Sequence, residues 1–231
     1  MTAPATARDQ LVALAAGDHA WASSWRYAIG TLDPARTRDA AVLVLFGVLD
    51  AVPSDHRAAA VARDLDVLLL ARAASLGSHA GQVAFPGGRV DPGDGGPVDA
   101  ALREAVEETG LDAAGVEVIG TFPPLPLPVS HHLVTPVLGW WARPTPVHVV
   151  DVGESAHVFR VPVADLVDPE NRRTVVARRG PRAYRSPGFV VTADGRDHLV
   201  WGFTAGILDA VLDRLGWAEP WDRDRTVDAP L

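Results

Sequence analysis

The chain alternates between short apolar runs and polar connections, a pattern that favours a β-sheet with helices over a helical bundle. Two runs, 40–49 and 66–72, are apolar through their interior and have the length of buried strands. Shorter apolar segments bounded by glycine, proline or charged residues predict further strands at 82–85, 116–122, 133–141, 157–161 and 189–192.

Other segments show the spacing of helices. Residues 97–109 and 201–215 each predict a helix, and a shorter one is expected at 163–167. Because strands and helices are interleaved, we predict an α/β fold in which a mixed β-sheet carries helices on both faces. The helix at 201–215 has one apolar face, formed by Ile207, Leu208, Val211, Leu212 and Leu215.

The size of the chain favours one main domain. Its 231 residues are 48% hydrophobic and 22% charged, which suits a folded protein with one substantial core. The first dozen residues and the stretch from Glu219 onward show no clear period, so we expect each to fray or to drape over the body of the protein. The predicted organisation is an N-terminal extension at 1–38, a folded domain at 39–217 and a C-terminal tail at 218–231.

Composition and charge exclude several classes of protein. The chain has no cysteine, which excludes disulfides, thiolate metal sites and cysteine nucleophiles. A net charge of −8 argues against nucleic acid as the main partner. The start of the chain lacks the apolar segment of a signal peptide, and 40–49 is too short to span a bilayer, so we expect a cytoplasmic protein without membrane contact.

Arginine is concentrated in one stretch of the chain. We interpret it as a solvated face in preference to a phosphate-binding patch. Its members are Arg172, Arg173, Arg178, Arg179, Arg182 and Arg185.

The helix predicted at 97–109 separates apolar from acidic residues. Pro97 suits the first helical position, and Gly110 can adopt the left-handed cap. At 100° per residue, Glu104, Glu107 and Glu108 share one side. The opposite side, expected to be buried, holds Val98, Ala101, Leu102, Ala105, Val106 and Thr109.

The acidic side of this helix needs positive charge. Glu104 and Glu108 form an i,i+4 pair of like charges that costs an isolated helix about 0.2–0.5 kcal/mol. Arg103 can pair with Glu107 and relieve part of this repulsion. A divalent cation would relieve the rest, and carboxylates without sulfur ligands favour Mg²⁺ or Mn²⁺. Taken alone, the helix fits a solvated acidic face better than a metal site.

The segment before the helix changes this balance in favour of a site. Gly87 and Gly88 follow a predicted strand and allow a ligand to approach the backbone closely. Pro92 and Gly93 predict a turn that carries Asp94 toward the acidic helix. A strand, a glycine-rich loop and an acidic helix together predict a metal–phosphate site.

These residues resemble the Nudix box, in which Gly, five residues, Glu and seven residues precede Arg-Glu-apolar-x-Glu-Glu-x-Gly-apolar. Here Gly88 begins the box and Arg103 to Leu111 complete it. The chain departs from the pattern in having Asp94 for Glu, one extra residue before Arg103, and the small Ala105 at the first apolar position. The resemblance implies a Nudix-type α/β/α sandwich and a hydrolase domain at 39–217.

The departures resemble the coenzyme A pyrophosphatase branch of this family. That branch also carries an upstream signature, roughly Leu-Leu-Thr-x-Arg-Ser/Ala, then Arg, then Gly-x-x-x-Phe-Pro-Gly-Gly. This chain matches it at 68–73 and 81–88, except that Leu70 and Gly77 replace the Thr and the second Arg. Further similarity lies at 134–137, around Glu154 and at 201–207, so the resemblance covers about residues 40–215.

The resemblance implies roles for individual residues. Glu104, Glu107 and Glu108, with the Gly87 carbonyl, are the candidate ligands of Mg²⁺ or Mn²⁺, and Arg103 orients the glutamates. The candidate general base is Glu154, which could equally be a solvated acid of its loop, and the alternative base is Glu104. Two further points stay open at this stage. Asp94 either fixes the loop or touches the metal, and Arg72, Gln82 and Phe85 either line the nucleotide pocket or belong to the scaffold.

Three functions are compatible with these residues. The first is hydrolysis of coenzyme A and acyl-coenzyme A to 3′,5′-ADP and 4′-phosphopantetheine. The second is hydrolysis of ADP-ribose, NADH or another nucleoside diphosphate derivative, which the changes at Leu70 and Gly77 would favour. The third is a Nudix-fold ligand sensor without turnover, against which the complete set of carboxylates argues. A small-molecule nucleotide is the expected partner, and a homodimer is the assembly considered.

Overall fold

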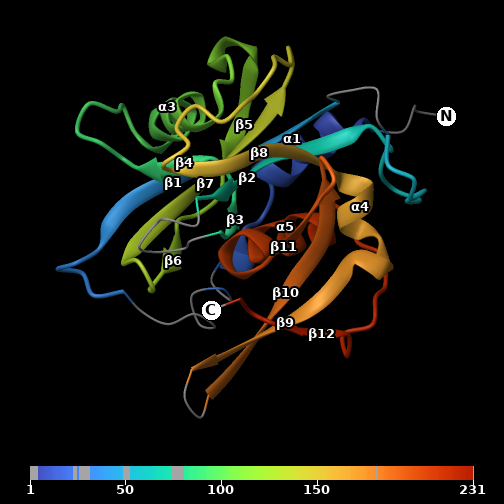
Figure 1. Cartoon of the computed structure of the whole chain (residues 1–231). Coiled ribbons are helices and arrows are strands. Elements are labelled where there is room, and N and C mark those ends of the chain that lie inside the picture. Colours follow the sequence, from blue (N-terminus) through green and yellow to red (C-terminus); the bar gives the residue numbers. More distant parts are fainter. Residues whose placement is uncertain are drawn as a thin grey trace. The chain divides into compact units, whose positions relative to one another are not determined.

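The computed structural model describes residues 5–22, 25, 32–48, 53–73, 81–179 and 182–230 (Figure 1). The chain divides into two compact units, and each combines segments that are distant in the sequence. The first contains Met1–Gly47 and Phe85–Ser155, and the second contains Val48–Ala84 and Ala156–Leu231.

A mixed sheet forms the centre of the first unit. Its longest strands, β1 (Arg38–Val48) and β7 (His132–Trp141), run parallel from Arg38 opposite His132 to Phe46 opposite Trp140. Both are buried along most of their length, as expected for strands covered on both faces. Three strands add antiparallel pairs, β4 (Gly87–Arg89) with β1, and β5 (Val116–Thr121) and β6 (Leu125–Leu127) with β7. The predicted α/β class with a mixed sheet is confirmed.

Helices accompany this sheet. Helix α3 (Pro97–Thr109) has the predicted bounds, contacts β4 and β7, and is followed by the short helix η1 (Ala113–Gly115). Helix α1 (Ala7–Ala16) contacts β5 and β7.

Of the two alternatives expected for the first dozen residues, helix α1 supports draping over the body, because it contacts β5 and β7. Thr6 and Asp9 form a capping box at its start, which satisfies backbone N–H groups of the first turn. The Arg8 guanidinium donates to the Glu117 carboxylate on β5. The cap and this long-range ion pair order a segment whose apolar periodicity is weak.

The buried side of α3 differs from the predicted one. Val106, expected in the core, is 39% exposed, whereas Glu108, expected at the surface, is 7% exposed. The helix instead packs through Ala100, Ala101, Ala105 and Thr109. The reason is tertiary, because the Gly87 N–H donates to Glu108 Oε2 at 2.9 Å and holds that carboxylate inward.

The second unit contains a small group of strands around β2 (Leu65–Arg72). Strand β3 (Val83–Ala84) pairs antiparallel with β2, and β8 (Ser155–Pro162) also pairs with it. Helix α4 (Val163–Val167), at its predicted position, packs on β2 and leads into η2 (Pro169–Asn171).

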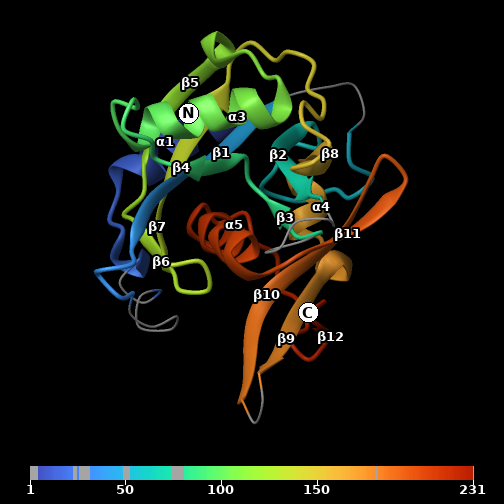
Figure 2. The ribbon, with the colours of Figure 1, turned by 60° about the vertical axis from the view of Figure 1, so that its left-hand side comes forward.

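A four-stranded sheet completes the second unit, in the order β11-β10-β9-β12. Strands β9 (Arg172–Arg179) and β10 (Arg182–Ala193) form the long hairpin drawn in orange in Figure 2, and β11 (Arg196–Val200) pairs with β10. Helix α5 (Gly202–Arg214) lies within the predicted 201–215 and contacts β10. Strand β12 (Thr226–Asp228) pairs in parallel with β9, so this part of the end from Glu219 lies against the sheet, as the second alternative expected.

The arginine-rich stretch is part of this sheet, and its first member corrects the prediction of a solvated face. Arg172 is only 1% exposed, and its guanidinium pairs with Asp209 on α5. The same guanidinium lies 4.4 Å from the Phe189 ring centre and 4.7 Å from that of Trp221. Burial lowers the pKa of Arg172, and Asp209 opposes that effect. Arg178, in contrast, is exposed as expected.

Removing the carboxylate partner of Arg172 is expected to destabilise the fold. Asp209→Asn leaves a buried guanidinium without a counter-charge, which costs about 3 kcal/mol of the free energy of unfolding. The control is Asp228→Asn, which breaks the exposed Arg178–Asp228 pair and costs about 1 kcal/mol or less. Urea unfolding measures both, and equal losses would contradict a special role for the buried pair.

Among helices in the described part of the chain, none is both long and apolar enough to cross a membrane.

Candidate functional site

The site begins with the signals that define α3. Pro97 occupies the first turn, and Asp99 accepts the Gly95 N–H at 2.9 Å. Gly110 ends the helix at φ 68°, and its N–H donates to the Val106 carbonyl. This left-handed cap is accessible to glycine at little cost. The four charged residues of the box, Arg103, Glu104, Glu107 and Glu108, therefore occupy fixed positions on one helix.

Two glycines bring the backbone of β4 against the carboxylates of α3. The Gly87 N–H donates to Glu108 Oε2. A Cβ at Gly87 would lie 2.3 Å from the Ala41 carbonyl oxygen, and one at Gly88 would lie 2.4 Å from the Glu104 carboxylate. Only bare backbone fits between β1 and the acidic helix at these positions.

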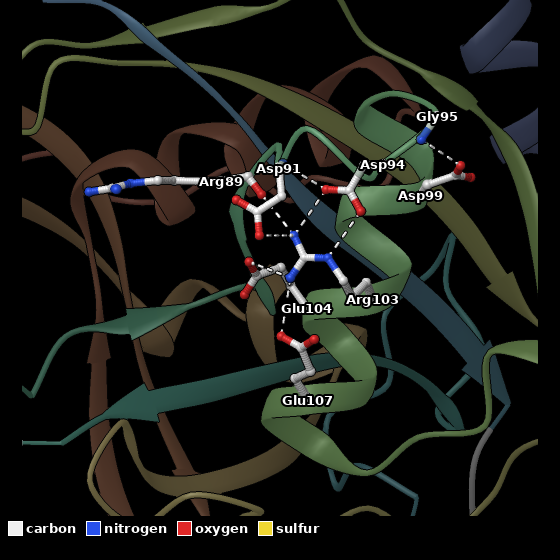
Figure 3. A network of polar contacts seen from close by, with 8 residues as sticks. All are labelled: Arg89, Asp91, Asp94, Gly95, Asp99, Arg103, Glu104 and Glu107. Atoms are coloured by element: carbon white, nitrogen blue, oxygen red, sulfur yellow. Dashed lines mark hydrogen bonds and ion pairs between the residues drawn. The ribbon is translucent and has the colours of Figure 1, made fainter.

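Arg103 joins the parts of the site (Figure 3). Its Nη1 donates to Glu104 Oε1 at 3.0 Å and to Glu107 Oε2 at 3.1 Å. Its Nε and Nη2 each lie 3.0 Å from one oxygen of Asp94. The Nη2 also donates to the Arg89 carbonyl at 3.0 Å. One guanidinium thus fixes two glutamates relative to the glycine-rich loop.

The loop supports Asp94 in return. The Asp91 N–H donates to Asp94 Oδ2 at 2.8 Å, and the Asp94 N–H donates to the Asp91 carbonyl at 3.0 Å. The Asp91 carboxylate lies 3.7 Å from Arg103 Nη2. The observed contacts of Asp94 are those of a residue that fixes the loop and holds Arg103.

The charged groups of the site shift one another's pKa values, some upward and some downward. The hydrogen bond from Arg103, with a second from the Asp91 N–H, lowers the pKa of Asp94, and the same bond raises the pKa of Arg103. Burial raises the pKa of Glu104, and Arg103 opposes this effect. The Glu104 carboxylate is therefore a partly desolvated charge that further positive charge would stabilise.

The lowered pKa of Asp94 predicts a pH dependence of stability. A group whose pKa falls on folding stabilises the protein above its unfolded pKa of about 3.9, and this stability is lost as the pH falls through the folded value. The melting temperature of Asp94→Asn should therefore lie below that of the wild type at pH 7. The difference should shrink as the pH falls below about 4. Thermal unfolding across that range measures it, and a constant difference would contradict the ion pair as its cause.

The structure brings together some of the residues singled out in the sequence and leaves others apart. Arg103, Glu104, Glu107, Glu108 and Gly87 meet as described above. Glu154 is exposed in a turn, where its N–H donates to the Asp151 carbonyl at 3.2 Å. No hydrogen bond or ion pair among the described residues joins its carboxylate to α3.

Of the three candidate pocket residues, Arg72 ends β2, and Gln82 and Phe85 directly precede and follow β3 in the sequence. The Arg72 N–H donates to the Gln82 carbonyl at 3.0 Å, and both side chains are partly exposed. Phe85 is buried. Gly77 lies outside the described residues.

Two parts of this network were not predicted from the sequence. One is the Arg89 carbonyl, which no side-chain pattern reveals because the backbone supplies the acceptor. The other is Asp91, whose signal was present as an Asp-Pro-Gly-Asp turn that places two carboxylates three residues apart.

The donor chemistry of the site fits a hard divalent cation. Its side chains offer only carboxylate oxygens, and glycine at 88 leaves room for Glu104 beside the backbone. Among the described residues, no three His, Asp or Glu side chains lie close enough together to hold a metal ion. Arg103 bridges Glu104 and Glu107 instead.

Comparison with known proteins gives a consistent family match. A family model described as the NUDIX domain matches residues 54–182. A Cronobacter sakazakii protein named "Uncharacterized Nudix hydrolase NudL" is 39% identical over 150 residues, which cover 65% of this chain and 75% of that protein. A protein of the same name from Escherichia fergusonii is 37% identical over 168 residues, which cover 70% of this chain and 84% of that protein.

Solved structures show a weaker likeness. The Nudix hydrolase RenU from M. smegmatis is 26% identical, with a TM-score of 0.44 over 57% of this chain and 75% of that one. The NUDIX domain of Shewanella oneidensis NrtR, complexed with ADP ribose, is 22% identical, with a TM-score of 0.41 over 58% of this chain and 80% of that one. At such TM-scores, the structural likeness adds nothing to the family match.

Proposed function

Because this chain belongs to the Nudix hydrolase family, we propose that it is a pyrophosphohydrolase that uses Mg²⁺ or Mn²⁺ and cleaves coenzyme A and its derivatives. The products would be 3′,5′-ADP and 4′-phosphopantetheine. The observation that carries the proposal is the placement of the Glu104 and Glu108 carboxylates against the bare backbone of Gly87 and Gly88.

The oxygen donors proposed for the metal are Glu104, Glu107 and Glu108, with the Gly87 carbonyl. When bound, the divalent ion neutralises phosphate oxygens and lowers the pKa of the attacking water. The chain itself supplies placement. Arg103, held by Asp94, fixes Glu104 and Glu107, while the Gly87 N–H fixes Glu108.

The general base stays a choice between Glu154 and Glu104. Glu154 is exposed, so its carboxylate is accessible to substrate and water. Glu104 has one carboxylate oxygen already engaged by a hydrogen bond from Arg103, which leaves it less free to accept a proton from water. We therefore favour Glu154 and keep Glu104 as the alternative.

The coenzyme A assignment rests on the upstream signature and on its departures. Leu70, which stands where the signature has Thr, is fully buried in β2. This departure therefore changes the core of the second unit and adds no polar group at its surface. The loss of Arg at Gly77 removes a candidate phosphate ligand and favours the second candidate function, hydrolysis of ADP-ribose, NADH or a related diphosphate. Arg72, Gln82 and Phe85 stay candidate substrate contacts.

A panel of substrates distinguishes these functions. Purified protein is incubated with coenzyme A, ADP-ribose or NADH, each with Mg²⁺ or Mn²⁺ and with excess chelator, and the products are separated by chromatography. We expect metal-dependent release of 3′,5′-ADP from coenzyme A at the highest kcat/KM. Faster release of AMP from ADP-ribose or NADH would show that one of these, and not coenzyme A, is the preferred substrate. Binding of a nucleotide without turnover would support the third function, a ligand sensor.

A further inference from the structure

Residues 143–154, which make up almost all of the connection between β7 and β8, are attached to the end of helix α3. We call this segment the strap. The Arg143 N–H donates to the Gly115 carbonyl at 3.1 Å. The Asp112 N–H donates to Thr145 Oγ1 at 3.2 Å. These contacts place the first part of the strap beside the residues that follow α3.

His148 makes the contact nearest to the helix itself. Its backbone N–H donates to the carbonyl of Thr109, the last residue of α3, at 2.9 Å. Its imidazole lies over Gly110, so that a Cβ at that glycine would be 2.6 Å from His148 Cε1. Gly110 is therefore bare for two reasons, its left-handed φ of 68° and the ring that rests on it.

Beyond His148 the strap turns around Asp151. Asp151 Oδ1 accepts the Gly153 N–H at 2.7 Å, and the Asp151 carbonyl accepts the N–H groups of Glu154 and Ser155 at 3.2 and 2.9 Å. Ser155, the first residue of β8, is fully buried. Glu154 thus lies between an ordered turn and a buried strand end.

The side chains of this second part face solvent. Val152 is 81% exposed, and Val150 and Glu154 are also exposed. His148 is itself exposed, so the strap is held there by its backbone hydrogen bond to Thr109 and by the contact of its ring with Gly110, and the part that carries Glu154 presents its side chains outward.

We propose that His148 is a positioning residue that sets the strap on the end of α3 and thereby places Glu154 to act as the general base. This inference rests on the proposed function. Glu108 immediately precedes Thr109, the residue that the His148 N–H engages. The six residues from His148 to Glu154 span at most about 20 Å, so the anchor limits where Glu154 can lie relative to the acidic helix.

Variants at the two positions test the coupling through steady-state kinetics with coenzyme A. Glu154→Gln should lower kcat about 10²-fold, the usual contribution of a general base. His148→Ala should lower kcat about 10-fold with little change in KM, since a displaced base affects the chemical step. His148→Phe keeps a flat ring over Gly110 and should restore kcat to near the wild-type value. Val150→Ala, an exposed change in the strap beyond the anchor, is the control and should leave kcat unchanged.

The double variant decides whether His148 acts through Glu154. His148→Ala in the Glu154→Gln background should lower kcat no further, because the group being positioned is already lost. Three results would each overturn the positioning role. They are a double variant whose kcat loss is the product of the two single losses, a wild-type kcat in Glu154→Gln, and a kcat that His148→Phe does not restore. None of these outcomes affects the proposed hydrolase function, which Glu108→Gln tests separately.

Discussion

Replacement of Glu108 by glutamine is expected to lower kcat about 10³-fold while the melting temperature stays close to that of the wild type. Glu108 is almost fully buried, and one carboxylate oxygen accepts the Gly87 N–H. The amide oxygen of glutamine can accept the same hydrogen bond, so the local packing is retained. The negative charge proposed to hold the divalent ion is lost.

A matched substitution isolates this loss of charge. Glu117→Gln makes the same chemical change on β5, where Glu117 pairs with Arg8 outside the proposed site. We expect its kcat to equal that of the wild type. Steady-state kinetics at saturating Mg²⁺ measure both variants, and near-normal turnover by Glu108→Gln would refute its assignment as a metal ligand.

The second large effect is expected from Gly88→Ala. The added Cβ would lie 2.4 Å from the Cδ and Oε1 of Glu104, closer than nonbonded carbon and oxygen approach. The Glu104 carboxylate must move away from the added methyl group, and this movement strains the hydrogen bond that it accepts from Arg103. A displacement of about 1 Å in such a site lowers kcat about 10²-fold.

Gly93→Ala is the control for this change. Gly93 lies in the same loop, and a Cβ there would meet no atom within 4 Å. Titration of each variant with Mn²⁺, followed by calorimetry and by turnover, should show weakened metal binding and activity for Gly88→Ala alone. Equal behaviour of the two variants would contradict the close approach of β4 to Glu104.

The sequence was most informative where local signals determine structure. Helix α3 has the predicted bounds because Pro97 and Gly110 act within one turn of their own positions. Family membership was likewise predicted, because the box is long and its spacing is restrictive. Strands β4 and β6 were missed, since each has three residues and is ordered by its neighbour in the sheet.

The errors arose where distant residues decide the outcome. Periodicity placed Val106 inside and Glu108 outside, but it could not include the Gly87 N–H that draws Glu108 inward. Arg172 was predicted to be solvated because its sequence neighbours are charged. Its burial depends on Asp209 and Trp221, which only the folded sheet brings to it.

The most direct test of the central claim is hydrolysis of coenzyme A in ¹⁸O-labelled water with Mg²⁺, with mass spectrometry of the products. A pyrophosphohydrolase should yield 3′,5′-ADP and 4′-phosphopantetheine, with one ¹⁸O atom in the phosphate of one product and no reaction when the metal is chelated. Folded wild-type protein that cleaves neither coenzyme A nor any other nucleoside diphosphate derivative in this assay would contradict the account.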